Sequence, residues 1–280
     1  MQNIHSHVWD QQLHIDPATV REAELSRGRP LDLTVTLADA VREAEPFEKV
    51  AVFGLKARLT GYWVPDTFVA ELVAQAPDKL VGFACCDPTD RAHMDELTEA
   101  IEHLDLRGLK MGPIYAGFDP RDERCDAVYA YCQRRQIPIL FHTGTTFNRV
   151  APLRYAYADV FDDVAMRYPE LRMVLAHLGH PFHEQCICVI RKHPHVYADI
   201  SALHYRPWQF YNMMMLAQEY RVAHKLLLGT DYPFAGADET ITGLKRINDV
   251  TGDAGLPRIT DETVEGILHR DAFGLLGIRV

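Results

Sequence analysis

The stretch IPILFHTG, residues 137–144, joins a short apolar run to a histidine and a loop of small residues. Such a run is typical of a buried strand, so His142 would stand at the carboxyl end of that strand. Seven further stretches have the same strand character, and they are QNIHSH (2–7), KVAVFGL (49–55), LVGFACC (80–86), LRGLKMG (106–112), RMVLAHLG (172–179), VYADISA (196–202) and KLLLGTDY (225–232).

Segments with a helical period lie between these strands. TLADAVREAEPF (36–47) and DTFVAELVAQA (66–76) are examples, and each begins with a residue that suits a helix N-cap. Eight strands that alternate with helices predict an α/β protein with a single closed (β/α)8 barrel, or TIM barrel, as one domain over residues 1–280. Such barrels usually have about 250 residues. A doubly wound open sheet is the alternative.

The composition narrows the class of partner. Among 280 residues, 39 acidic and 29 basic side chains give a formal net charge of −10, without a basic cluster. This balance speaks against nucleic acid and against an anionic membrane surface as partners. The chain has no run of roughly 18 apolar residues and no amino-terminal leader pattern, so we expect a cytoplasmic protein with reduced cysteines. The run Met213 to Met215 suits either an exposed face in a homodimer or, more commonly, a core helix face.

The predicted strand ends carry the residue types of a metal site. In a parallel barrel the carboxyl ends of all strands meet at one mouth, where catalytic residues collect. The ends carry His5, His7, Lys110, His142, His177, His180 and Asp231. Imidazoles and a carboxylate gathered in one mouth would be costly without a partner, and a divalent metal supplies one. Zinc suits these donors best, with manganese or iron as alternatives.

Five motifs in this order resemble a known family. The opening H-x-H, GLK (108–110), FHTGT (141–145), LAHLGHP (175–181) and LLLGTDYPF (226–234) resemble the amidohydrolase superfamily, in particular the branch that includes aminocarboxymuconate semialdehyde decarboxylase. The ending ILHRDAFGLLG (267–277) is similar to the carboxyl-terminal helix of that branch. Many relatives have Asp where this chain has Asn3, and we expect little consequence because an amide also donates and accepts hydrogen bonds.

The resemblance also implies roles for the strand-end residues. It makes His5, His7, His142 and Asp231 the ligands of one mononuclear metal, and it puts His177 beside the metal-activated water or against the substrate oxygen. A metal lowers the pKa of its water to about 7, and Asp231 would take the proton from that water.

The sequence is compatible with three roles for Lys110. Elsewhere in the superfamily a carboxylated lysine at this position bridges two metals, in which case His142 and His177 would both bind the second ion. We favour a second role, in which Lys110 is not carboxylated and contacts an anionic substrate. In the third role Lys110 is a structural lysine that contacts neither metal nor substrate.

The substrate is expected to be a small anionic molecule. Lys110, His180 and Arg206 are the candidate substrate-binding residues, and an arginine can hold a carboxylate with two hydrogen bonds. Neighbouring loop residues that could face the same mouth are His204, Tyr205, Arg58 and Trp63. The site suits a metal-dependent hydrolase of a lactone, ester or amide of a small organic acid. The alternatives are a decarboxylase of an aromatic or muconate-type acid, and a barrel that only binds its ligand.

Overall fold

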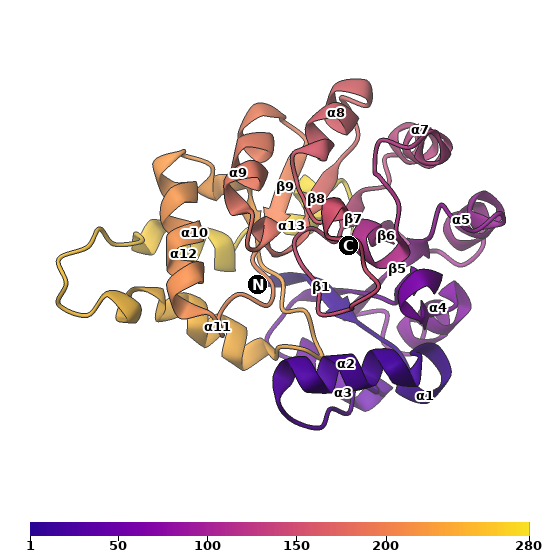
Figure 1. Ribbon diagram of the computed structural model, residues 1–280, viewed down its shortest axis with the longest axis horizontal. Helices are drawn as coiled ribbons and strands as arrows, with labels where there is room; N and C mark the ends of the chain where they lie inside the picture. The colour runs from indigo at the N-terminus through magenta and orange to yellow at the C-terminus, as the bar shows by residue number, and fades with distance from the viewer. Residues whose placement is uncertain (280) are drawn as a thin grey trace.

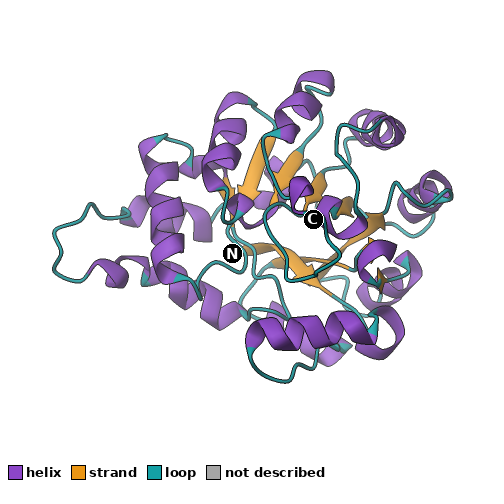
Figure 2. Cartoon of the chain, in the orientation of Figure 1, coloured by secondary structure: helices purple, strands orange, loops and turns teal. Residues whose placement is uncertain are grey.

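Eight parallel strands form the centre of the molecule, and helices surround them. The computed structural model describes residues 1–279, and Figures 1 and 2 show the strands encircled by helices. The strands pair in chain order and are β1 (Gln2–His7), β2 (Lys49–Phe53), β5 (Leu80–Cys86), β6 (Gly108–Met111), β7 (Ile139–Phe141), β8 (Met173–Leu175), β9 (Val196–Asp199) and β10 (Leu226–Leu227).

The chain nearly closes this sheet into a barrel. Backbone hydrogen bonds join β1 to the segment that follows β10, from Ile4 N to Leu228 O at 3.0 Å and from His7 N to Tyr232 O at 2.7 Å. A parallel bridge between Ser6 and Tyr232 continues this seam. The predicted (β/α)8 barrel is therefore confirmed, and the open doubly wound sheet is wrong.

The helices follow one another around the strands. They are α1 (Gln11–His14), α2 (Pro17–Arg27), α3 (Leu37–Ala44), α4 (Asp66–Val73), α5 (His93–Glu102), α6 (Pro113–Ala116), α7 (Asp126–Arg135), α8 (Val160–Arg167), α9 (His183–Lys192), α10 (Pro207–Glu219), α11 (Ala237–Lys245), α12 (Asp261–Leu268) and α13 (Ala272–Leu275). The start of α3 shows a capping box: the Thr36 hydroxyl accepts a hydrogen bond from Asp39 N, and the Asp39 carboxylate accepts one from Thr36 N.

Short elements occupy the connections. An antiparallel pair, β3 (Lys56–Ala57) and β4 (Tyr62–Trp63), follows β2. The 3₁₀ turns are η1 (Arg58–Thr60), η2 (Glu123–Cys125), η3 (Leu153–Tyr155), η4 (Ala176–Gly179), η5 (Ala223–Lys225) and η6 (Ile247–Thr251).

The amino-terminal end of the barrel is filled by apolar side chains. Ile4, Phe53, Phe83 and Leu140 point into the barrel and pack with Phe273 of the carboxyl-terminal helix α13, which is seen through the ring of strands in Figure 1. Gln2 ties this helix to β1 by accepting from Phe273 N at 3.0 Å. Because this end is plugged, polar chemistry inside the barrel is confined to the opposite end.

The structure bears on what the sequence suggested for the cysteines and for the run Met213 to Met215. The six cysteines are free, and all but Cys188 are buried. Met213 and Met214 of α10 have no exposed surface, so the exposed reading of the methionine run is wrong and the core reading is confirmed. A homodimer stays a prediction. None of the helices in residues 1–279 combines the length and the apolar character that crossing a bilayer demands.

Candidate metal centre

The first strand delivers two imidazoles to the inside of the barrel. His5 and His7 both point inward although Ile4 does so too, because the pairing of β1 with β2 shifts register between Asn3 and Ser6; the two imidazole centroids lie 5.4 Å apart. Asn3 anchors this segment, because its Oδ1 accepts from His5 N at 3.0 Å and from Thr230 N at 3.2 Å. The asparagine thus fixes β1 against the loop that carries Asp231, and the small consequence expected for the change from Asp stays a prediction.

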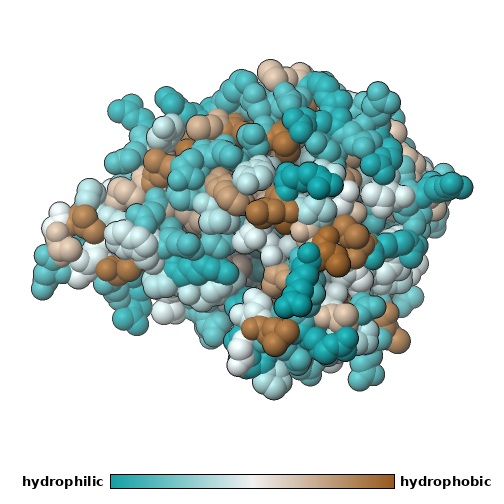
Figure 3. All heavy atoms as spheres, in the orientation of Figure 1, coloured by the Kyte–Doolittle hydropathy of each residue, from teal (hydrophilic) through white to brown (hydrophobic). Residues whose placement is uncertain are grey.

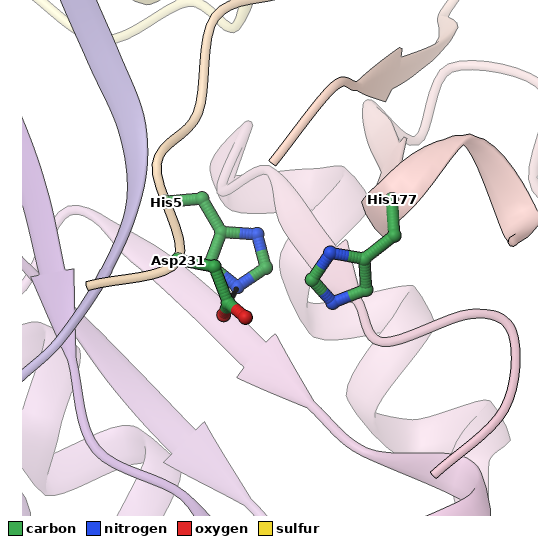
Figure 4. Close-up of side chains that lie close together, drawn as sticks. All are labelled: His5, His177 and Asp231. Atoms are coloured by element: carbon green, nitrogen blue, oxygen red, sulfur yellow. Dashed lines mark ion pairs between the residues drawn. The ribbon is translucent and has the colours of Figure 1, made fainter. Parts of the chain in front are cut away.

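Three side chains converge above this point, one from β1 and two from the segments that follow β8 and β10. His5 Nε2 lies 3.2 Å from Asp231 Oδ1, and His177 faces the same carboxylate across the barrel (Figure 4). One ligand atom from each of the three residues lies within 4.8 Å of the others. All three residues are buried. His5, His177 and Asp231 therefore form a site for one divalent metal ion.

Two further predicted residues adjoin this cluster. His7 Nε2 lies 3.4 Å from Asp231 Oδ1, and His142 Nδ1 lies 3.3 Å from His177 Nε2. In the described part of the chain, His7 Nδ1 and His142 Nε2 are buried without a hydrogen-bond partner. Unsatisfied nitrogens of this kind are rare in folded proteins, and here each is the ring nitrogen that does not contact Asp231 or His177.

Sequence reasoning missed the residues that orient these imidazoles. Asp199 Oδ2 lies 2.8 Å from His5 Nδ1, and Asp199 Oδ1 accepts from His177 N at 3.0 Å. Ser201 Oγ donates to Asp199 Oδ1 and lies 2.8 Å from His177 Nδ1. The i, i+2 spacing of Asp199 and Ser201 at the end of β9 is the same signal that identified the H-x-H pair. Applied to this strand, it would have found them.

Burial favours the neutral form of three imidazoles of the site, because it lowers their pKa values. It lowers the pKa of His7 to about 3 and moves the pKa values of His142 and His177 below the ordinary histidine range. A neutral imidazole offers a lone pair, which is the form that binds a metal.

The carboxylate at the centre is ionised. Burial alone would raise the pKa of Asp231, but nearby His177 and the contacts with His5 and His7 hold it well below the usual range. Burial lowers the pKa of Lys110 to about 8, against the raising influence of Asp231 and Asp199. The deep part of the site therefore combines a fixed negative charge with an amine that can lose its proton near neutral pH.

Local backbone geometry places two of the clustered residues. His177 in η4 has φ 56° and Asp231 has φ 72°, both in the left-handed region that non-glycine residues rarely adopt. The segment just before Asp231 is packed closely against β1, since a Cβ on Gly229 would lie only 2.8 Å from His5 Cβ. Such uncommon backbone conformations are typical of functional positions.

Comparison with known proteins agrees with this geometry. The family model described as "Amidohydrolase" matches residues 3–278. The chain belongs to the amidohydrolase family. The resemblance drawn from the five sequence motifs is thereby confirmed. No curated protein matches the sequence of this amidohydrolase.

Solved structures share the fold of this amidohydrolase at low sequence identity. A probable 2-pyrone-4,6-dicarboxylic acid hydrolase from Acinetobacter baumannii, with citric acid bound, is 16% identical with a TM-score of 0.70, and 99% of each chain is covered. A 5-carboxyvanillate decarboxylase from Sphingomonas paucimobilis is 15% identical with a TM-score of 0.66, covering 100% of this chain and 99% of that one. An amidohydrolase from Burkholderia multivorans with bound zinc is 15% identical with a TM-score of 0.68, and 99% of each chain is covered.

Of the clustered residues, His177 and Asp231 line a cavity of about 220 Å³, and His5 contacts Asp231 behind this lining. We call the deep, strand-borne group the floor and the loop-borne group around the opening the rim. The floor comprises His5, His7, Lys110, His142, His177 and Asp231, and the rim comprises Arg27, Tyr205 and Arg206. Figure 3 shows hydrophobic side chains scattered in small groups among hydrophilic ones on the face that it draws. A pocket of this size suits a small molecule.

The predicted substrate-binding residues all line this amidohydrolase cavity. Lys110 is buried at the floor, where its Nζ lies 3.2 Å from His5 Nε2 and 4.8 Å from the centroid of the Phe53 ring. His180 and Arg206 line the wall and the rim, and within the described residues His180 Nδ1 is buried without a hydrogen-bond partner. The three roles considered for Lys110 stay predictions, and its side chain lines the cavity.

The loop residues divide into two groups. Tyr205 lines the cavity as expected, but Arg58, Trp63 and His204 do not. Arg58 pairs with Asp90 at 2.9 Å and stacks at 3.6 Å from the centroid of the Trp63 ring, so nearby partners hold it away from the mouth.

His204 lines a separate surface pocket beside α11, where it contacts Thr240 and Glu239. Arg27 of α2, which sequence reasoning did not single out, completes the rim instead.

Proposed function

We propose that this protein is a metal-dependent hydrolase that cleaves a lactone, ester or amide of a small organic acid. The convergence of His5, His177 and Asp231 at the floor of a small cavity carries this proposal. The ion would be held by these three residues, and His7 and His142, which the resemblance also names as ligands, would complete its surroundings. Zinc is the expected metal, and a related structure holds zinc.

Hydrogen bonds at the far side of two rings support this ligand set. In metal sites, the ring nitrogen opposite the metal usually contacts a carboxylate or a backbone carbonyl, which fixes the tautomer. His5 Nδ1 contacts Asp199 Oδ2 at 2.8 Å, and His177 Nδ1 lies 3.1 Å from Ser201 O. Both rings therefore turn Nε2 toward the cluster.

The floor residues have different roles in the proposed reaction. A divalent metal, when bound, activates water at neutral pH and polarises a carbonyl group. Asp231, which is ionised and contacts both β1 imidazoles, is placed to take the proton from the attacking water. His177 lines the cavity beside Asp231 and would act there either as a ligand of the ion or, in the alternative that the resemblance implies, through Nε2 on the substrate oxygen. His177 and Asp231 are therefore the catalytic residues of the proposal.

Lys110 is proposed to contact an anionic group of the substrate. Its Nζ enters the floor beside His5 and has no carboxylate within ion-pair distance in the described chain. If carboxylated Lys110 bridges two metals instead, Lys110→Ala will halve the metal content. We expect one equivalent of metal in the wild type and in the variant, with weaker substrate binding in the variant.

Decarboxylation of an aromatic or muconate-type acid is the second candidate. The structural similarity to 5-carboxyvanillate decarboxylase favours it, and both reactions use the same floor residues. A panel of lactones and aromatic acids separates the two, because hydrolysis releases a proton whereas decarboxylation releases carbon dioxide.

Metal removal tests the proposal as a whole. The purified protein should contain about one equivalent of zinc or manganese. Chelation should abolish hydrolysis of lactones in the panel, and addition of zinc should restore it. A metal-free protein with full activity, or a metal-loaded protein without activity on the panel, would contradict it.

A further inference from the structure

Two arginines from distant segments meet around one tyrosine at the rim. The Cζ atoms of Arg27 and Arg206 each lie 4.5 Å from the centroid of the Tyr205 ring. Arg27 Nη2 donates to the Tyr205 hydroxyl at 3.1 Å. Arg27 ends α2, whereas Arg206 precedes α10, so the fold brings together cations that are far apart in the sequence.

The charges that line the cavity do not balance. Asp231 is the one carboxylate among its described lining residues, whereas Lys110, Arg27 and Arg206 are basic. Neither rim arginine has a carboxylate within 4.0 Å in residues 1–279, although Arg58 and many other arginines do. In a chain with a formal net charge of −10, two half-buried guanidinium groups without a carboxylate partner are positioned for an anionic ligand.

The arginines remain able to bind such a ligand. Arg206 uses Nη1 in one long contact of 3.4 Å with Ala202 O, and Arg27 uses Nη2 for the tyrosine. A guanidinium has five N–H groups, so each arginine retains donors for an oxyanion. Tyr205 holds both planes close to one ring, which reduces the freedom that binding would otherwise remove.

We propose that the rim binds a second oxyanionic group of the substrate, a carboxylate or a phosphate-like group, at the end away from the reacting bond. The substrate is then a derivative of a small diacid, with one charged end at Arg27 and Arg206 and the reacting end at the floor. This inference rests on the proposed function, since it assigns the substrate class of the same cavity. Arg27 becomes a residue that sets specificity.

Binding of simple diacids tests the rim without turnover. We suggest calorimetry on the zinc-loaded full chain with succinate, glutarate and adipate, each against the monoacid of equal length, butyrate, pentanoate or hexanoate. At least one diacid should bind about tenfold more tightly than its monoacid, because hydrogen bonds to charged groups contribute roughly 1.5–3 kcal/mol. 4-Phosphonobutyrate, compared with glutarate, identifies which oxyanion the rim prefers.

Variants of the rim locate the preference. Arg27→Gln and Arg206→Gln should each remove most of the diacid preference and leave monoacid binding within about twofold, since a fully lost charged contact would change it about tenfold or more. Arg21→Gln is the matched control, because Arg21 is an exposed arginine on the same helix and does not line the cavity. Melting temperatures will show that the variants are folded.

The outcomes separate this inference from the proposed function. A wild type without preference for any diacid, or equal losses in Arg27→Gln and Arg21→Gln, would overturn the rim assignment and leave metal-dependent hydrolysis untouched. Conversely, failure of the chelation test would remove the proposed function, whereas the ratio of diacid to monoacid binding would still report on the rim.

Discussion

The floor and the rim of one cavity are built from different parts of the chain. Floor residues lie at strand ends, are almost wholly buried and are held by hydrogen bonds from neighbouring strands. The rim comes from α2 and the segment before α10, and Tyr205 there is 36% exposed. The difference indicates that the reaction is fixed by the barrel whereas the choice of substrate is left to loops, which can change without disturbing the barrel.

Among the variants, Asp231→Asn is expected to have the largest effect on metal binding and turnover at the floor. The amide keeps the size of the carboxylate but loses the charge that the β1 imidazoles contact. We expect metal content to fall and turnover to drop by roughly 10²–10⁴-fold, the range for loss of a general base. Metal analysis and steady-state kinetics measure both. Asp238→Asn, which changes an exposed carboxylate in α11, should match the wild type; normal turnover in Asp231→Asn would refute the role assigned to the carboxylate.

His177→Ala compares two ligand sets within the floor. The resemblance puts His177 beside the water, whereas the geometry puts it in the cluster with His5 and Asp231. We expect zinc affinity and turnover to fall together, by about tenfold or more if one ligand is worth at least ~1.4 kcal/mol. Zinc titration against a chelating dye measures the affinity. Exposed His103 gives the control His103→Ala. Retention of tight zinc binding with lost turnover would support the set implied by the resemblance.

Asp199→Asn is expected to have a smaller effect, because Asp199 orients ligands and does not bind the metal itself. The amide would weaken the contacts with His5 Nδ1 and Ser201 Oγ. Loss of such a partner typically lowers metal affinity by about 10–100-fold. Turnover should recover at high zinc concentration, a readout that a purely structural defect would not give.

The control for this variant breaks a similar pair elsewhere. Asp162 Oδ1 lies 2.6 Å from His193 Nε2 on the outside of the barrel, so Asp162→Asn removes a carboxylate from an imidazole far from the cavity. Equal loss of zinc affinity in both variants would show that Asp199 has no special role.

The floor was predictable from the sequence because strand periodicity fixes where a side chain points. Once residues 137–144 were interpreted as a strand, the position of His142 at its carboxyl end followed. The same reasoning placed His5 and Asp231 at the mouth, although periodicity does not predict the register shift of β1 at His5 or the left-handed backbone that turns Asp231 inward beyond β10. Asp199 was not recognised as a site residue, because at the strand ends only histidines, Lys110 and Asp231 were considered. Its side chain is buried and lies one strand away from His177, as the register of β8 and β9 requires.

The rim was predicted only in part. Tyr205 and Arg206 were expected at the mouth and line the cavity, but Arg27 was not, because the path of a loop depends on contacts that a one-dimensional pattern does not contain. Arg58 was expected at the mouth, but Asp90 and Trp63 provide nearer partners. Arg27 reaches the cavity because α2 ends beside Tyr205, an arrangement that depends on how α2 packs on the barrel. No periodicity in residues 17–27 indicates this contact.

Tyr205→Phe would sharpen the comparison with the smallest expected effect. It removes the hydroxyl that accepts from Arg27 Nη2 at 3.1 Å and keeps the ring against which both arginines lie. One hydrogen bond contributes about 0.5–1.5 kcal/mol, so diacid binding should weaken by roughly two- to tenfold while zinc affinity is unchanged. Tyr220→Phe is a matched control, since Arg191 lies 5.2 Å from that exposed ring. A loss of zinc affinity in Tyr205→Phe would show that the rim and the floor are not independent, because a loop hydroxyl would then be controlling a metal site held by strands.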